Sequence, residues 1–275
     1  MDKIWFITGA GRGFGKEFAK AALGRGDKVT ATVRKLGDVD DLVEEFGDAV
    51  LPLQLDVTDR AGVFAAVGQA STHFGRLDVV VNNAGYGLFG AIEEITEQQL
   101  RDQLEVNLFG VLHVTQAVLP VLRKQGSGHI VQISTIGGVA AFPSLGGYHA
   151  SKWALEGLSE SLAQEVAPFG IKVTLVEPGG FATDWSGSSA VRAEPQPQYH
   201  PIRHAMAERG KQTPPELTGD PAAAGPALLD VVDAEQPPLR VFFGTMPTMI
   251  VPGIYQSRLD TWEQWKHVAI AANGH

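Results

Sequence analysis

The residues of this chain best suited to chemistry are a tyrosine and a lysine four positions apart, Tyr148 and Lys152. In a helix the two side chains lie on one face, about one turn apart. A lysine ammonium near a phenol favours the phenolate and so lowers the pKa of the tyrosine from about 10. Such a tyrosine can exchange a proton with an alcohol near neutral pH. The pair alone is a weak signal, because this spacing also occurs by chance.

Two hydroxyl residues and an asparagine stand at other informative places. Ser134 and Thr135 follow a predicted strand at residues 128–133. Successive strand residues point to opposite faces, so only one of the two hydroxyls is expected to reach a substrate. Asn107 lies inside a predicted helix at residues 97–122, where asparagine is a poor choice. A local kink, a core hydrogen bond and a functional role all remain possible for it.

A glycine-rich turn lies near the N-terminus, between a predicted strand at residues 4–8 and an amphipathic helix. It contains Gly9, Gly11, Gly13 and Gly15. Residues without a Cβ let the backbone approach phosphates, and a helix N-terminus offers free N–H groups to a dinucleotide pyrophosphate. The strict G-x-G-x-x-G fingerprint does not fit, because Phe14 occupies its third glycine position. A plain turn into a helix is the alternative.

The elements that must position these residues alternate between strand and helix along the chain. The alternation favours a single α/β domain, residues 1–275, with a doubly wound parallel seven-stranded sheet. The predicted strands are residues 4–8, 29–33, 50–55, 77–81, 128–133, 171–176 and 239–243.

The C-terminal third is less regular. Residues 184–220 are rich in Pro, Gly, Ser and Ala, and an irregular stretch just past a strand end is more often a substrate lid than a linker. The C-terminal segment, residues 250–275, contains an amphipathic stretch at residues 254–272 with Trp262 and Trp265.

The composition argues against several kinds of binding partner and functional site. The net charge is −9 with no basic cluster, which argues against nucleic acid or an anionic membrane as partner. The chain has no cysteine, so disulfides, thiolate metal sites and a Cys nucleophile are excluded. We expect no metal site and place His149, His200 and His204 at the surface. No signal peptide is evident and no apolar run reaches the ~18 residues of a membrane span, so we expect a cytoplasmic protein.

Taken together, the motifs resemble those of the short-chain dehydrogenase/reductase family over about residues 3–183. The resemblance implies a Rossmann fold and an NAD(P)-dependent oxidoreductase that interconverts a secondary alcohol and a ketone or aldehyde. The motifs that carry it are Thr8-Gly9-x3-Gly13-x-Gly15, Asn82-Asn83-Ala84-Gly85, Asn107, Ser134-Thr135, Tyr148-x3-Lys152 and Pro178-Gly179.

The resemblance implies a role for each catalytic residue. Tyr148 is the expected proton donor or acceptor, and Lys152 lowers its pKa and binds the nicotinamide ribose. Asn107 holds a water that links Lys152 to solvent. The family's serine usually lies 13 residues before the tyrosine, a position that Thr135 occupies here. We therefore predict that Thr135 rather than Ser134 polarises the carbonyl, with its extra methyl narrowing the site.

The charge at the end of the second strand indicates the cofactor. A carboxylate there would repel a 2′-phosphate, but this chain has Val33. Arg34 is then free to pair with the phosphate, helped by Arg12, so we predict NADP over NAD. The cofactor contacts that the resemblance implies are Gly9, Gly11, Arg12, Gly13, Phe14, Gly15, Arg34, Asp56, Val57, Asn83, Ala84, Gly85, Tyr148, Lys152, Pro178, Gly179, Phe181 and Thr183.

Two other readings use the same fold. A nucleotide-sensing protein that has lost catalysis is disfavoured because Tyr148, Lys152 and Asn107 are all present. A lyase or dehalogenase usually needs a changed cofactor loop, and the loop glycines are intact. We further expect a homodimer or homotetramer, because the helix after Tyr148 has more apolar surface than one sheet face covers. Plausible pocket residues are Phe142, Phe181, Trp185 and Met246.

Overall fold

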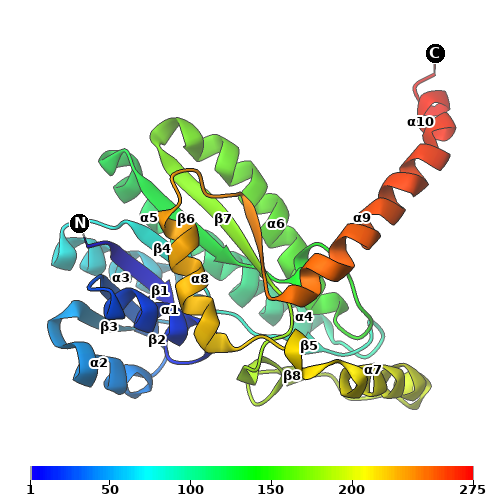
Figure 1. Ribbon diagram of the computed structural model, residues 1–275, viewed down its shortest axis with the longest axis horizontal. Helices are drawn as coiled ribbons and strands as arrows, with labels where there is room; N and C mark the ends of the chain where they lie inside the picture. The colour runs from blue at the N-terminus through cyan, green and yellow to red at the C-terminus, as the bar shows by residue number, and fades with distance from the viewer. Residues whose placement is uncertain (1, 275) are drawn as a thin grey trace.

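Seven short apolar strands form the central sheet of the computed structural model, which describes residues 2–274 (Figure 1). All neighbouring strands are parallel, in the order β3-β2-β1-β4-β6-β7-β9. The chain winds outward from β1 in one direction and from β4 in the other, so the predicted doubly wound α/β fold is confirmed. The strands are β1 (Ile4–Thr8), β2 (Lys28–Val33), β3 (Val50–Gln54), β4 (Val79–Asn82), β6 (Gly128–Ile133), β7 (Ile171–Pro178) and β9 (Arg240–Phe243).

Helices cover both faces of the sheet and create two apolar cores. In β1 the side chains alternate: Trp5 and Ile7 enter one core, and Ile4 and Phe6 enter the other. The first core is closed by α1 (Gly13–Gly24), α2 (Asp40–Phe46) and α8 (Pro221–Asp233). The second is closed by α3 (Arg60–Phe74), α5 (Val111–Gln125) and α6 (Gly146–Val166).

The long helix predicted over residues 97–122 is interrupted. It consists of α4 (Glu97–Leu104), a π-helical turn η3 (Glu105–Gly110) and α5. A wider turn of this kind breaks the 3.6-residue period, and π-turns are frequent at functional sites. Asn107 lies inside it, so the helix is locally irregular at this residue.

Residues 184–220 are more regular than predicted. They contain a 13-residue helix, α7 (His200–Gln212), along with turns η6 (Asp184–Ser186), η7 (Pro197–Tyr199) and η8 (Pro215–Leu217). Pro201 lies in the first turn of α7, where a missing N–H costs nothing. A short strand in this segment, β8 (Val191–Arg192), pairs with β5 (Leu88–Phe89) in a second sheet that was not predicted.

The segment is also fastened to the body through buried Glu94. Its carboxylate accepts a hydrogen bond from the Gln196 backbone N–H at 2.7 Å and pairs with the Arg203 guanidinium.

The C-terminal segment forms an arm that projects from the body (Figure 1). It consists of α9 (Thr245–Gln264) and α10 (Lys266–Ala272), so the helix begins earlier than predicted. Only Pro247 and Val251 of α9 are buried, whereas Trp262 is 68% exposed. The last residue of the predicted segment, 275, lies outside the described residues.

One helical segment meets the length and composition of a membrane span, contrary to our expectation from the sequence. This segment, Glu97–Gln125, joins α4, η3 and α5, and 39% of its most apolar window is buried. Core helices of globular proteins pass the same test, and α5 packs in the second core. The segment is therefore only weak support for a membrane span.

Close packing between α1 and α8 depends on Gly225. A Cβ there would lie 2.7 Å from the Ala21 Cβ and 2.8 Å from the Glu17 carbonyl oxygen. Gly225→Ala should lower the free energy of unfolding by about 1–3 kcal/mol, because the two helices must move apart. Gly68→Ala, in the exposed middle of α3 with no atom within 4 Å, should raise it by about 0.5–1 kcal/mol. Urea unfolding measures both; equal effects would contradict the packing argument.

Candidate active site

Tyr148 lies in the first turn of α6 and is covered by an aromatic side chain from residues 184–220. Its ring centroid is 5.0 Å from that of Trp185, and the tyrosine is only 6% exposed. Trp185 in turn packs on Phe89, and a Cβ on Gly87 would lie 2.7 Å from its ring. The predicted acid/base is thus held at the carboxyl end of the sheet beneath the predicted lid.

Lys152 lies one helical turn further along α6, as the spacing predicted. Its buried Nζ donates a hydrogen bond of 2.7 Å to the carbonyl oxygen of Ile133 and lies 5.9 Å from the Tyr148 ring centroid. Burial lowers the pKa of Lys152 to about 8.

The predicted lowering of the tyrosine pKa does not hold in this structure. Burial raises the pKa of Tyr148 above its usual value, and the nearby polar groups of Thr135 and Trp185 oppose this rise only in part. The Lys152 ammonium is directed at the Ile133 carbonyl, so desolvation of the phenolate outweighs its charge. Spacing in the sequence indicates the neighbouring charge but not the burial of the phenol.

Ser134 and Thr135 point to opposite sides, as expected of successive extended residues. The Thr135 hydroxyl accepts a hydrogen bond from the Gly137 N–H at 3.2 Å, donates to the Pro178 carbonyl at 3.4 Å, and lies beside Tyr148. The Ser134 hydroxyl is buried against Glu156 instead. The structure therefore brings Thr135, and not Ser134, together with the tyrosine.

Asn107 is fully buried and joins the π-turn to two other segments. Its Oδ1 accepts a hydrogen bond from the Tyr86 N–H at 3.1 Å, and its Nδ2 donates to the Tyr86 carbonyl at 3.0 Å. The same Nδ2 donates to the Ser151 hydroxyl at 3.2 Å, next to Lys152 in the chain. The core hydrogen bond considered for Asn107 is therefore present. Neither Tyr86 nor Ser151 was singled out from the sequence.

The glycine loop is shaped by hydrogen bonds across the sheet. Asn83 Nδ2 donates to the carbonyl oxygens of Thr8 and Gly9 at 2.9 and 3.1 Å. The Thr8 hydroxyl accepts from the N–H groups of Asn83 and Ala84 at 2.9 and 3.0 Å. A Cβ on Gly15 would lie 2.4 Å from the Gly9 oxygen, so only glycine fits.

This loop leaves the start of α1 open to an anion. Gly13 has φ +53°, and no atom lies within 4 Å of where its Cβ would be. No side chain caps α1, and its first turn has no acidic residue. Free N–H groups and the positive end of the helix dipole therefore face the loop, which fits a dinucleotide phosphate.

After β2, Arg34 is placed as predicted for binding a 2′-phosphate, whereas Arg12 is paired with another residue. Val33 is buried and Arg34 is exposed, with no carboxylate within ion-pair distance of Arg34 among residues 2–274. Arg12, however, faces Asp184 of the η6 turn at 3.5 Å. Asp38, which the sequence argument overlooked, lies beside the loop, since a Gly11 Cβ would be 2.7 Å from its Cβ.

The other predicted cofactor contacts gather at the same edge. Asp56 accepts a hydrogen bond from the Thr58 N–H at 3.0 Å, so it forms a turn after β3. Phe181 packs edge-on against Phe14 with centroids 4.8 Å apart. The remaining positions here are Val57 against Gly110, Gly85 against Asn107, Gly179 against Pro247, and Thr183, which caps η6.

The prediction for one histidine was wrong. His149 is buried, its Nδ1 accepts from the Phe142 N–H at 3.4 Å, and burial lowers its pKa to about 4. It lies on the inward face of α6, so the helical period could have indicated this. His200 and His204 are exposed as predicted. Within residues 2–274 no group of three or more His, Asp or Glu side chains could hold a metal ion.

Comparison with known proteins gives a consistent result. The profile of the family described as short chain dehydrogenase matches residues 3–193. Oxidoreductase BOA17 of Botryotinia fuckeliana is 42% identical over 273 residues, which cover 99% of this chain and 100% of that protein. The 3-ketodihydrosphingosine reductase of Bacteroides thetaiotaomicron is 39% identical over 248 residues, which cover 90% of this chain and 89% of the relative.

Solved structures agree with these relatives. The crystal structure of a short-chain dehydrogenase from Streptomyces avermitilis superposes with a TM-score of 0.92 at 39% identity and covers 98% of each chain. A Burkholderia cenocepacia short chain dehydrogenase in complex with NADP has a TM-score of 0.76 at 27% identity, covering 96% of this chain and 97% of the other. A Burkholderia phymatum relative in complex with NAD has a TM-score of 0.75 at 25% identity, covering 88% of each. The chain therefore belongs to the short-chain dehydrogenase/reductase family and is an oxidoreductase.

Proposed function

We propose that this protein is an NADP-dependent oxidoreductase that interconverts a secondary alcohol and a ketone or aldehyde. The observation that carries the proposal is the pairing of the Tyr148 phenol with the Thr135 hydroxyl beneath Trp185, with Lys152 one turn away. These groups can hold a carbonyl oxygen and give it a proton.

Each residue has a distinct task in carbonyl reduction. Tyr148 donates its proton to the substrate oxygen and takes it back in alcohol oxidation. The Thr135 hydroxyl donates a hydrogen bond to the same oxygen as negative charge develops there. Lys152 stabilises the phenolate that remains on Tyr148 and binds the nicotinamide ribose. The nicotinamide cofactor, when bound, supplies or accepts the hydride.

Asn107 acts on this reaction through its neighbours. Both ends of its amide are already hydrogen-bonded, to Tyr86 and to Ser151. We propose that Asn107 holds the π-turn in place beside Lys152. The π-turn in turn would position a water through which the lysine exchanges protons with solvent.

The proposed cofactor site follows the carboxyl edge of the sheet. The open start of α1, where Gly13 leaves room, would hold the pyrophosphate. Arg34 would bind the 2′-phosphate, and Asp56 and Val57 would border the adenine. Asn83 to Gly85 would lie along the adenine ribose, and Pro178 to Thr183 would hold the nicotinamide amide.

The substrate site lies under residues 184–220, which we propose act as a lid. Trp185 covers Tyr148, so this side chain must move before a substrate reaches the phenol. The aromatic surroundings support an apolar ketone or secondary alcohol of moderate size. The name of the Bacteroides relative makes a long-chain amino ketone a reasonable member of a substrate panel.

Replacement of the acid/base and of each hydroxyl tests the mechanism. Nicotinamide absorbance is followed with a panel of ketones and alcohols. Tyr148→Phe should lower kcat about 10²–10⁴-fold, because the proton donor is lost. Thr135→Ala should lower it about 10²–10³-fold, because one hydrogen bond to the developing oxyanion is lost.

Ser134→Ala and Thr135→Ser serve as matched controls for this experiment. Ser134→Ala removes a hydroxyl one residue away that faces Glu156, so it should cost far less turnover than Thr135→Ala. Thr135→Ser keeps the hydroxyl and should retain most activity. A larger loss from Ser134→Ala than from Thr135→Ala would reverse the assignment. Cofactor binding without turnover on any compound would favour a sensor.

Cofactor choice is tested at Arg34. Arg34→Leu should raise the KM for NADP about 10–100-fold, because a charge-assisted hydrogen bond to the 2′-phosphate is lost, and should leave the KM for NAD nearly unchanged. Lys35→Leu, with the same charge change one residue on, is the control and should have a smaller effect. A wild-type kcat/KM that favours NAD would refute the charge argument.

We also propose that the protein is a homodimer or homotetramer. The apolar surface of α6 supports an assembly only weakly, because its Leu155 and Leu162 are buried within the chain itself. The arm gives better support, because its exposed apolar residues include Tyr255, Leu259, Trp262 and Trp265. The Arg258 guanidinium joins the arm to exposed Trp153 of α6, 4.9 Å from that ring. Exposed apolar surface of this kind marks an interaction site.

Light scattering tests the assembly. The full chain should have the mass of a dimer or tetramer. Trp262→Asp should shift the population toward monomer, because a charge replaces apolar area that the proposed interface would bury. Phe64→Asp, at an exposed aromatic residue on α3, should leave the mass unchanged. A monomeric wild type would rule out the assembly.

A further inference from the structure

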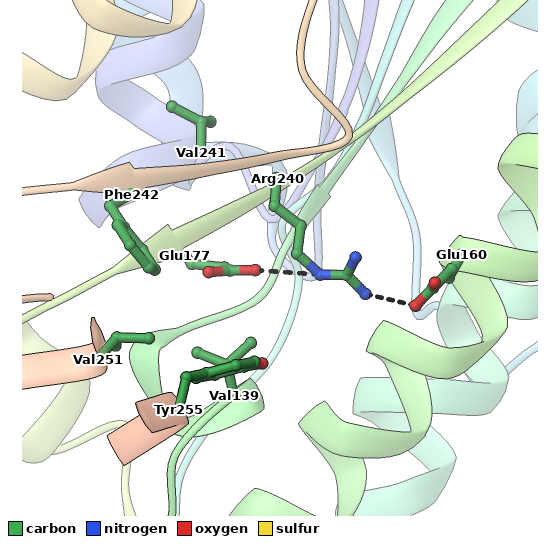
Figure 2. Close-up of a pocket in the computed structure, with 8 residues that line it drawn as sticks. All are labelled: Val139, Glu160, Glu177, Arg240, Val241, Phe242, Val251 and Tyr255. Atoms are coloured by element: carbon green, nitrogen blue, oxygen red, sulfur yellow. Dashed lines mark hydrogen bonds and ion pairs between the residues drawn. The ribbon is translucent and has the colours of Figure 1, made fainter. Parts of the chain in front are cut away.

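Three glutamates, Glu156, Glu160 and Glu177, surround Arg240 at the edge of the sheet. Figure 2 shows Arg240 between two of them, Glu160 and Glu177. Arg240 of β9 places its Nε 3.0 Å from Glu156 Oε2 and 3.5 Å from Glu177 Oε1. Its Nη2 lies 2.9 Å from Glu160 Oε2. Arg240, Glu160 and Glu177 border a cavity of about 450 Å³ that is also lined by Val139, Val251 and Tyr255.

The three carboxylates differ in their surroundings. Glu156 and Glu177 are 5% and 1% exposed, whereas the Glu160 side chain is 55% exposed. Oε1 of Glu156 and Oε1 of Glu177 have no hydrogen-bond partner within residues 2–274. One guanidinium cannot balance two buried carboxylates, so one of the pair is expected to hold a proton.

Arg240 Nε lies closer to Glu156 (3.0 Å) than to Glu177 (3.5 Å), which indicates that Glu156 is the charged member of the pair. Burial raises the pKa of Glu177 to about 8, so this carboxyl is largely protonated at neutral pH. The pKa of Glu156 is also raised by burial, but the Ser134 hydroxyl and Arg240 oppose the rise. With Arg240 Nε at hydrogen-bonding distance, Glu156 is the carboxylate that the guanidinium holds in its ionised form.

Glu156 lies one helical turn after Lys152 on the inward face of α6. Lys152 has no carboxylate within 4 Å in the part of the chain that the structure describes, and its Nζ bonds the Ile133 carbonyl. Burial disfavours its ammonium form, and the carboxylate whose charge opposes this effect is Glu156.

We infer that Glu156, held in place by Arg240, is a positioning residue that keeps Lys152 protonated and thereby sets the upper pH limit of the Tyr148–Lys152 pair. The inference rests on the proposed function of that pair. Glu156 acts through the lysine and touches neither substrate nor cofactor.

Charged and titratable neighbours surround Glu156 from three elements. On α6 these are Lys152, whose ammonium favours the carboxylate, and Glu160, which shares Arg240 but is solvated. From the sheet, β9 supplies Arg240 and β7 supplies Glu177. Burial favours the protonated, neutral form of Glu177. The Ser134 hydroxyl, directly after β6, lies beside Glu156 and favours its carboxylate.

The direct test measures the titration of Lys152 in the free protein. NMR of the chain labelled at lysine Cε follows each lysine against pH, and a Lys152→Met variant assigns the resonance. Glu156→Gln should lower the midpoint of Lys152 by about one pH unit, because a nearby opposite charge is removed. Glu160→Gln, which removes a carboxylate from the same arginine one turn further on, should move it far less.

A kinetic measurement provides the second readout. In carbonyl reduction, the alkaline limb of kcat/KM should move to lower pH in Glu156→Gln by the same amount, because Lys152 loses its proton earlier. Glu156→Asp keeps the charge, so it should restore most of the wild-type profile. If Glu156→Gln fails to fold, Glu156→Asp is measured alone and should show a smaller shift in the same direction.

The outcomes separate the two proposals. A Lys152 midpoint that stays in place, with only a lower melting temperature, means that Glu156 and Arg240 form a structural ion pair, and the inference is overturned. If the Lys152 midpoint shifts in Glu156→Gln while the wild type turns over no substrate, the inference about Lys152 is supported and the proposed reaction is refuted.

Discussion

Burial of one lysine ammonium at the carboxyl end of β6 is the constraint on which the rest of the site depends. Removal from water pushes the pKa of Lys152 down to about 8 and that of Tyr148 up. Both shifts oppose the ion pair that the proposed chemistry needs. The protein must therefore supply compensation, and it does so with the Ile133 carbonyl at 2.7 Å and the charge of Glu156.

The topology explains why these groups can meet. Sheet order reverses between β1 and β4, where ligands of such folds bind, and the Thr8 and Asn83 hydrogen bonds fix the backbone there. From β6 onward the chain alternates between the two sides: Thr135 faces Tyr148, and Ser134 faces Glu156. Two successive residues thus separate the side of the strand that faces Tyr148 from the side that faces Glu156.

Much of the fold and part of the site could be predicted from sequence, because the signals are local. Strand runs and loop glycines reflect backbone constraints that act within a few residues, and the four-residue spacing places Tyr148 and Lys152 on one helix face. The π-turn was missed because its extra residue breaks the period that predicts a helix. Helix α7 has no buried residue, so it gave no periodic signal.

Buried polar side chains were the main failure, for a physical reason. Charged and polar side chains are usually solvated, so Glu156, Glu177 and His149 were taken for surface or ignored. The two glutamates are buried against a partner far away in the chain, Arg240 on β9. The predicted direction of the Tyr148 pKa shift was wrong for a related reason. A neighbouring charge can be predicted from spacing, but desolvation of the phenol depends on the Trp185 side chain, which comes from a later segment and covers it.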